Sequence, residues 1–227
     1  IPQGIEIRTG KFRDLEFTDD LFACVLQYPN ANGNAEDYRE FTEKAHTANC
    51  KVAVAADILS LALLTPPGEW GADIVFGTTQ RLGTPMFYGG PSAGYFATRD
   101  EYKRNMPGRI IGWSKDKYGK LCYRMALQTR EQHIKREKAT SNICTAQALL
   151  ATMAGFYTVY HGQEGIRNIA SRIHSITVFL EKSIGKLGFK QVNKQYFDTL
   201  RFILPDSVSA QQIRTIALSK ELSLIHI

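Results

Sequence analysis

Short apolar segments alternate with helical patterns along the first hundred residues, and this alternation constrains the fold more than any other feature of the sequence. Residues 35–49 place apolar side chains on one helical stripe. Four segments have the length and apolar character of buried strands: 22–27, 51–57, 71–77 and 94–98. Strands that are apolar on both faces and alternate with helices are typical of a mostly parallel sheet covered on both sides. The sequence therefore predicts an α/β fold.

The second part of the chain predicts two long helices followed by a smaller unit. One apolar stripe runs through residues 146–160, and a second one, with spacings of three and four, runs through 166–187. A strand at 198–204 and a helix at 207–221 are expected to follow, with Ser207 or Ser209 as the helix cap. This change of pattern predicts a domain boundary near residue 187.

The expected domain organisation has three parts. Residues 1–186 are interpreted as a partial large domain, and residues 187–221 as the start of a small α+β domain. The final hexapeptide, 222–227, resembles a translated sequencing adapter, so it is set aside as an expected artefact. Both ends look cut, and the parent protein is expected to be longer.

Composition excludes several classes of function. The chain has 227 residues, of which 44% are apolar, and a net charge of +6. Its four cysteines form no C-x-x-C pair, which argues against a zinc site and for reduced thiols in the cytosol. The longest apolar stretch, 58–64, is too short to span a bilayer, and no nucleic-acid module is recognisable. We therefore expect neither a membrane nor a nucleic acid as a partner.

Asp57 is the first candidate for chemistry, because it ends a predicted buried strand where α/β sheets bind their ligands. A pyridoxal-phosphate enzyme needs an acid beside the pyridine nitrogen and a lysine for the Schiff base. The turn after the next strand, residues 77–83, contains no lysine. From the residues alone, a carboxylate that caps a loop or helix is the favoured interpretation.

Two loops could hold an anion. The glycine-rich segment 88–94 could cradle one with its backbone N–H groups, but its spacing favours a simple tight turn. Residues 140–145 precede a predicted helix, with Asn142 as a good N-cap and a basic segment at 135–138 upstream. This second loop is either a phosphate site or a capped helix behind a solvated basic segment, and the residues leave both open.

The histidines show no catalytic pattern. His46, His133, His161 and His174 have no acid or cysteine at a recognisable spacing. His174 lies on the flank of the second helical stripe and is expected on the surface.

Five strings together resemble the glycine-cleavage P-protein family, over nearly all of residues 4–221. They are TPPGEWGAD at 65–73, YGGP at 88–91, MPGR at 106–109, LQTREQHI at 127–134 and REKATSNICTAQ at 136–147. Ser92 departs from the histidine that usually follows Gly-Gly-Pro in this family.

The resemblance implies a fold type I, aminotransferase-like large domain with a mostly parallel sheet. The family has two homologous halves, which are fused in some organisms and separate subunits in others, and this chain resembles the middle of the first half. The implied activity is glycine dehydrogenase (aminomethyl-transferring), the decarboxylation of glycine with pyridoxal phosphate and transfer of the aminomethyl group to the lipoyl group of H-protein. The implied assembly is a homodimer or heterotetramer, cytoplasmic in bacteria and mitochondrial in eukaryotes.

The resemblance also implies a division of labour between the halves. The Schiff-base lysine belongs to the C-terminal half, and matching the turns places Gln80 or Arg81 at its position here, so that Asp57 becomes a vestige of the pyridine partner. No catalytic residue is expected in this chain, which alone should be inactive. Thr140, Ser141 and Asn142 are expected to reach the cofactor phosphate across the interface between halves. The alternatives are a purely structural or dimerisation half, or another fold type I enzyme such as a desulfurase.

Overall fold

The computed structural model describes residues 4–222, except 88, 107–108, 129–135 and 140–146. Its centre is a four-stranded sheet in the order β1-β2-β3-β4. The first three strands, β1 (Ala23–Tyr28), β2 (Lys51–Ala56) and β3 (Ile74–Thr78), are parallel, and β4 (Gly94–Thr98) runs antiparallel to β3. The four predicted strands and the mostly parallel sheet are therefore confirmed.

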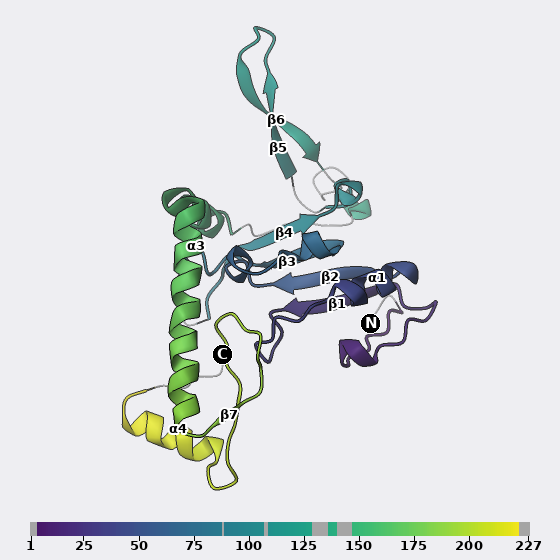
Figure 1. Cartoon of the computed structure of the whole chain (residues 1–227). Helices are drawn as coiled ribbons and strands as arrows, with labels where there is room; N and C mark the ends of the chain where they lie inside the picture. Colours follow the sequence, from purple (N-terminus) through teal and green to yellow (C-terminus); the bar gives the residue numbers. More distant parts are fainter. Residues whose placement is uncertain (1–3, 88, 107–108, 129–135, 140–146, 223–227) are drawn as a thin grey trace.

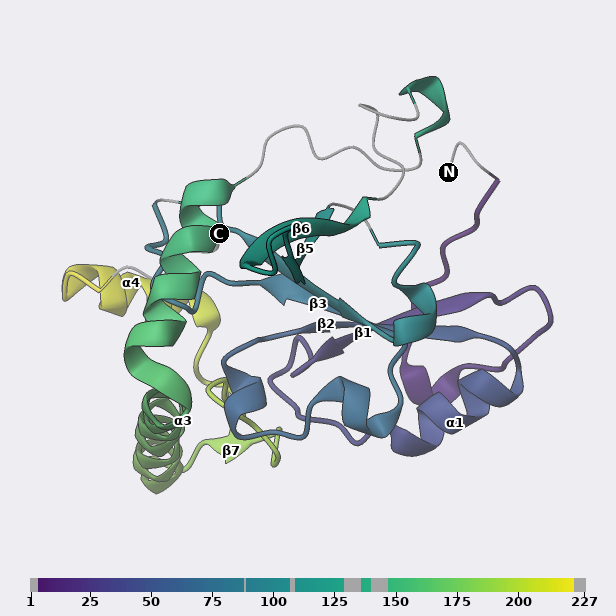
Figure 2. The same cartoon turned by 90° about the horizontal axis from the view of Figure 1, so that it is seen from above.

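Helix α1 (Arg39–Thr47) covers one face of this sheet, as Figure 2 shows. Its predicted stripe is buried against alternate side chains of β1 and β2, which form one apolar core. On the other face of the sheet, Val25 is 70% and Phe76 is 36% exposed. Within the described residues, this second face therefore has less cover than the sequence predicts.

Helix α3 (Ala148–Lys186) combines the two predicted long helices. Gly162 interrupts it with φ 61° and ψ −176°, so the two stripes belong to segments on either side of a kink. Near the sheet, Ile166, Ile169 and Ile173 pack around a small core of Leu59, Ala170 and Phe197. The stripe is not buried throughout, however, since its later members Ile176, Leu180 and Leu187 are exposed.

The C-terminal elements are shorter than predicted. A two-stranded sheet pairs β7 (Lys190–Gln191) with β8 (Phe202–Ile203), where a strand over 198–204 is expected. The strand is short because residues 193–199 form a loop, in which the buried Asn193 side chain donates to the Thr199 carbonyl at 2.7 Å. Helix α4 (Ala210–Ser219) is capped by Ser209, whose hydroxyl accepts from the Gln212 N–H, which confirms the second of the two predicted caps.

A β-hairpin that the sequence analysis does not predict extends away from the sheet beyond β4 (Figure 1). It consists of β5 (Arg109–Lys115) and β6 (Leu121–Gln128), paired antiparallel. Five short 3₁₀ helices complete the described elements: Phe12–Asp14, Ser60–Ala62, Pro67–Trp70, Asp100–Tyr102 and Arg136–Lys138. None of the helices in the described part of the chain is long and apolar enough to cross a membrane.

Candidate functional site

A pocket of about 530 Å³ opens at the carboxyl ends of the parallel strands. Its lining includes Tyr28 at the end of β1, Asp57 just after β2, and Thr78, Gln80 and Arg81 at and after the end of β3. The carboxyl ends of parallel strands meet at one edge of a sheet, which is where open α/β folds bind ligands. The pocket therefore lies where the sequence analysis expects chemistry.

Arg81 connects the acidic side chains at this edge of the sheet. Its Nη2 lies 2.8 Å from Asp57 Oδ2 and also donates to Asp198 Oδ2, and the guanidinium lies over the Phe197 ring. Although burial acts against the charged form, the carboxylates of Asp198 and Asp57 raise the pKa of Arg81. Of the two residues proposed for the lysine position, Arg81 is thus the one that contacts Asp57, and its charge is matched by two acids.

Asp57 performs the capping role that the sequence favours. Its Oδ1 accepts hydrogen bonds from the N–H groups of Leu59 at 2.9 Å and Ser60 at 3.4 Å, while Oδ2 faces Arg81. The capping interpretation is therefore confirmed, and the ion pair is an addition that local sequence does not show. Both oxygens have partners within the protein.

Hydroxyl groups lie next to the pocket, on β3 and on the strand and loop beside it. Tyr95 donates to the Ala56 carbonyl at 2.8 Å, and burial, with the nearby Asp57 charge, raises the pKa of Tyr95 to about 12. The hydroxyls of Thr78 and Ser92 lie 2.6 Å apart. Gly77 is required here, because a Cβ on it would come within 2.4 Å of the Ala56 carbonyl oxygen. These contacts fix a neutral, hydrogen-bonding wall.

The glycine-rich loop forms a turn after Met86. The N–H groups of Gly89 and Gly90 both donate to the Met86 carbonyl, and Gly89 has φ +87°. These two donors are used inside the turn, which agrees with the tight-turn interpretation. The predicted phosphate contacts Thr140, Ser141 and Asn142 lie outside the described residues.

Pyridoxal phosphate held through a lysine does not fit this edge. The turn after β3 has no lysine, and Arg81 lies at the position facing Asp57 with both of its acidic neighbours engaged. No amine lies among the side chains that line the described pocket. This edge of the sheet lies where a cofactor site is expected, but it lacks the lysine that would anchor the cofactor.

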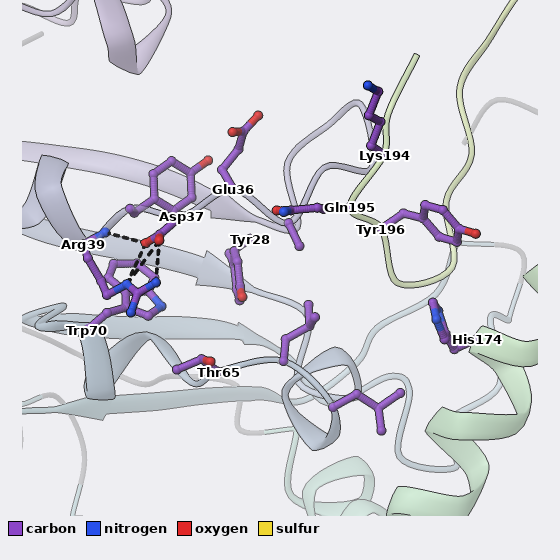
Figure 3. A pocket seen from close by; sticks show the side chains of 14 residues that line it. Tyr28, Glu36, Asp37, Arg39, Thr65, Trp70, His174, Lys194, Gln195 and Tyr196 are labelled. Carbon is purple, nitrogen blue, oxygen red and sulfur yellow. Dashed lines mark hydrogen bonds and ion pairs between the residues drawn. The ribbon is translucent and has the colours of Figure 1, made fainter. Parts of the chain in front are cut away.

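A second pocket, of about 610 Å³, lies between the start of α1 and residues 194–196 (Figure 3). Its charged side chains include Arg39, which pairs with Asp37 at 2.6 Å. His174 lines it too, with Nδ1 2.8 Å from the Phe197 carbonyl oxygen and its ring against Tyr196. His174 is expected on the surface, and it lies on α3 at the edge of this open pocket, partly buried because the 193–199 loop folds back over α3.

A histidine–carboxylate pair lies at the opposite, amino edge of the sheet. His46 Nε2 donates to Asp73 Oδ2 at 2.9 Å, and the same oxygen accepts from the Val52 N–H at 2.8 Å. No recognisable spacing in the sequence pairs His46 with an acid, and the fold supplies its partner, Asp73. The pair joins α1 to the residue before β3, across 27 positions, and a spacing rule for nearby motifs does not reveal it.

Comparison with known proteins identifies the family. The family model of the glycine cleavage system P-protein matches residues 1–227. This chain belongs to that family. It is 99% identical over 224 residues to glycine dehydrogenase (decarboxylating) of Bacteroides fragilis, and 54% identical over 205 residues to the mitochondrial glycine dehydrogenase (decarboxylating) of Dictyostelium discoideum. These matches cover 99% and 90% of this chain but only 24% and 21% of the relatives, so the chain spans about a quarter of their length.

Solved structures place the fold in the same family and in fold type I. An inhibitor-bound glycine decarboxylase (P-protein) is 34% identical with a TM-score of 0.83, over 92% of this chain and 48% of that one. A cysteine desulfurase from Thermococcus onnurineus and an aspartate aminotransferase from Thermus thermophilus share the fold, with TM-scores of 0.57 and 0.59. Nearly the same stretch fills 48% of the solved P-protein chain and 24% of the Bacteroides relative, which is therefore about twice as long as that solved chain.

Proposed function

We propose that this chain is part of the lysine-free half of a P-protein that decarboxylates glycine and passes the aminomethyl group to the lipoyl group of H-protein. The observation that carries the proposal is Arg81, which lies against Asp57 where a Schiff-base lysine is expected. The activity for which the relatives are named, glycine dehydrogenase (decarboxylating), supports the reaction. Their length, twice that of the solved P-protein chain, supports a protein with two fused halves.

The cofactor of this reaction would be pyridoxal phosphate, which supplies an electron sink when it is bound. In this proposal the C-terminal half holds it. Thr140, Ser141 and Asn142 of the present half offer hydroxyl and amide groups to its phosphate, helped by the helix start that follows them. Glycine, lipoyl H-protein and the C-terminal half are the proposed partners.

The first test locates the cofactor in the full-length Bacteroides relative. Borohydride reduction followed by peptide mass spectrometry should find the cofactor fixed on a lysine outside the stretch that matches this chain. A cofactor fixed at any lysine within residues 4–221 would overturn the proposal.

The second test asks whether this half touches the cofactor. Ser141→Ala and Asn142→Ala in the full-length relative should weaken cofactor affinity about tenfold or more, since each removes a hydrogen bond to a charged phosphate. Ser175→Ala is the matched control, because the Ser175 hydroxyl donates only to the Ser171 carbonyl of its own helix turn.

A structural role without chemistry is the second candidate. The Asp57–Arg81–Asp198 cluster favours it, because this cluster satisfies its charges internally and joins segments 117 positions apart. Unchanged cofactor affinity and turnover in both variants would favour this structural role over a direct contact with the cofactor.

A further inference from the structure

One face of the β5–β6 hairpin carries five exposed apolar side chains. The register pairs Ile111 with Met125 and Trp113 with Tyr123, and Leu121 lies beyond them. The two rings of the central pair meet edge to face, with centroids 5.9 Å apart. The five side chains of this face, which we call the hairpin face, are between 42% and 76% exposed: Ile111, Trp113, Leu121, Tyr123 and Met125.

An isolated hairpin with such a face lacks the packing that stabilises a sheet. Two strands alone are marginally stable in water, and a third strand or a packed layer is normally needed. Here β5 and β6 pack chiefly on each other, and Figure 1 shows them extending from the sheet into open space. Large exposed apolar patches of this kind mark interaction sites. The hairpin face is therefore expected to be buried against another part of the protein or a partner.

Charge at the tip narrows the choice of partner. Lys115 ends the hairpin face, and Lys117 and Lys120 lie in the turn beside it. The acid of this turn, Asp116, accepts hydrogen bonds from the N–H groups of Tyr118 and Lys120 and so fixes the turn. A second copy of this hairpin would bring lysines to lysines, whereas an apolar patch with acidic residues at its rim would complement it.

We propose that the hairpin face docks on the other half of the full-length protein, against an apolar patch with an acidic rim. The inference rests on the proposed two-half organisation and adds the surface through which the halves meet. Relatives twice as long as the solved P-protein chain carry that second half in the same polypeptide. Covalent linkage gives it a high effective concentration, so the contact need not be strong on its own.

Photo-crosslinking in the full-length Bacteroides relative tests this directly. Benzoylphenylalanine in place of Trp113 should crosslink to peptides of the other half, beyond the part of the relative that corresponds to the solved P-protein chain. The matched control is the same probe in place of Arg124, which lies opposite Gly112 on the reverse face of the hairpin and is also exposed. The Trp113 probe should give about tenfold more crosslinks to the other half than the control, as expected for a buried contact.

Two results would overturn the proposal. One is crosslinking from position 113 only to peptides of the same half, which would identify the rest of that half or a second copy as the occupant. The other is an absence of crosslinks in a protein that retains full turnover. Because borohydride mapping locates the cofactor independently, failure of the docking surface is distinguishable from failure of the proposed function.

A charge reversal tests the acidic rim. Lys120→Glu should lower the crosslinking yield from position 113 about threefold, the size expected for a rim charge, and Arg124→Glu should leave it unchanged. Equal effects of the two variants would contradict the assignment of the rim to the tip.

Discussion

Two carboxylates at opposite ends of the parallel strands use similar partners in different ways. Asp73, before β3, is 1% exposed and bound by the Val52 N–H, by His46 and, at 3.7 Å, by Arg99. Asp57, after β2, is 22% exposed and meets Arg81 at the rim of a pocket. A fully buried carboxylate anchors the fold, whereas a partly exposed one at the rim of a pocket can be part of a site. The exposed fraction of each aspartate and its position in the sheet distinguish the two roles.

The largest expected effect is at the amino edge. Asp73→Ala in the full-length relative should destabilise the domain by about 3–5 kcal/mol, because it leaves the Val52 N–H, His46 and Arg99 without their acceptor. Thermal and denaturant unfolding would measure the loss. Asp100→Ala, which removes an exposed acid paired with Lys103, is the control and should change stability by less than about 1 kcal/mol. Equal losses of stability in the Asp73 and Asp100 variants would show that the burial of Asp73 adds nothing to its contribution.

The pH dependence of stability should also depend on Asp73. Burial alone would raise its pKa, but hydrogen bonds from Val52 N–H and His46, with the charge of Arg99, hold the pKa of Asp73 below its usual value. Its contribution is therefore fully present above about pH 4, the ordinary value for aspartate, and is lost as the pH falls through the lower folded value. Asp73→Asn should flatten the acid limb of the stability profile. An unchanged acid limb would refute the assignment.

A smaller effect is expected at the carboxyl edge. Arg81→Met should cost about 1–2 kcal/mol, since the cluster is partly exposed and solvent screens it. A double-mutant cycle with Asp198→Asn should give a coupling of about 1 kcal/mol. A coupling of zero would mean that the contact between these two segments contributes nothing to stability.

The smallest effect is expected at Gln80. Gln80→Ala should change stability by less than about 0.5 kcal/mol, because Gln80 contributes its backbone N–H, which donates to Thr78 Oγ1. Unfolding curves of this variant and of Arg81→Met, measured side by side, check the order. A larger effect at Gln80 than at Arg81 would contradict this order.

The strands and α1 could be predicted because local pattern and burial agree there. Val52 and Val54 are fully buried in β2, and Ala45 is fully buried in α1. The helical stripe through 166–187 shows the limit of this reasoning. Its period marks a face that can be buried but does not say what covers it, and Ile176 remains 59% exposed.

Contacts between residues far apart in the chain could not be predicted from the sequence. The resemblance placed Gln80 and Arg81 near the lysine position, and geometry was needed to choose Arg81. Asp198 joins that cluster from 117 positions away. The hairpin, in contrast, carries a readable signal: Ile111, Trp113, Tyr123 and Met125 alternate with small or polar residues on either side of a turn containing Gly119.

The break in α3 has a consequence for how this protein tolerates change. A backbone with φ 61° and ψ −176° is open essentially to glycine alone. The direction of the helical segment before Gly162, relative to the segment after it, therefore depends on a residue that has no side chain. Any other residue at this position would steer the first part of the helix, together with the exposed Phe156 and Tyr160, toward a different neighbour.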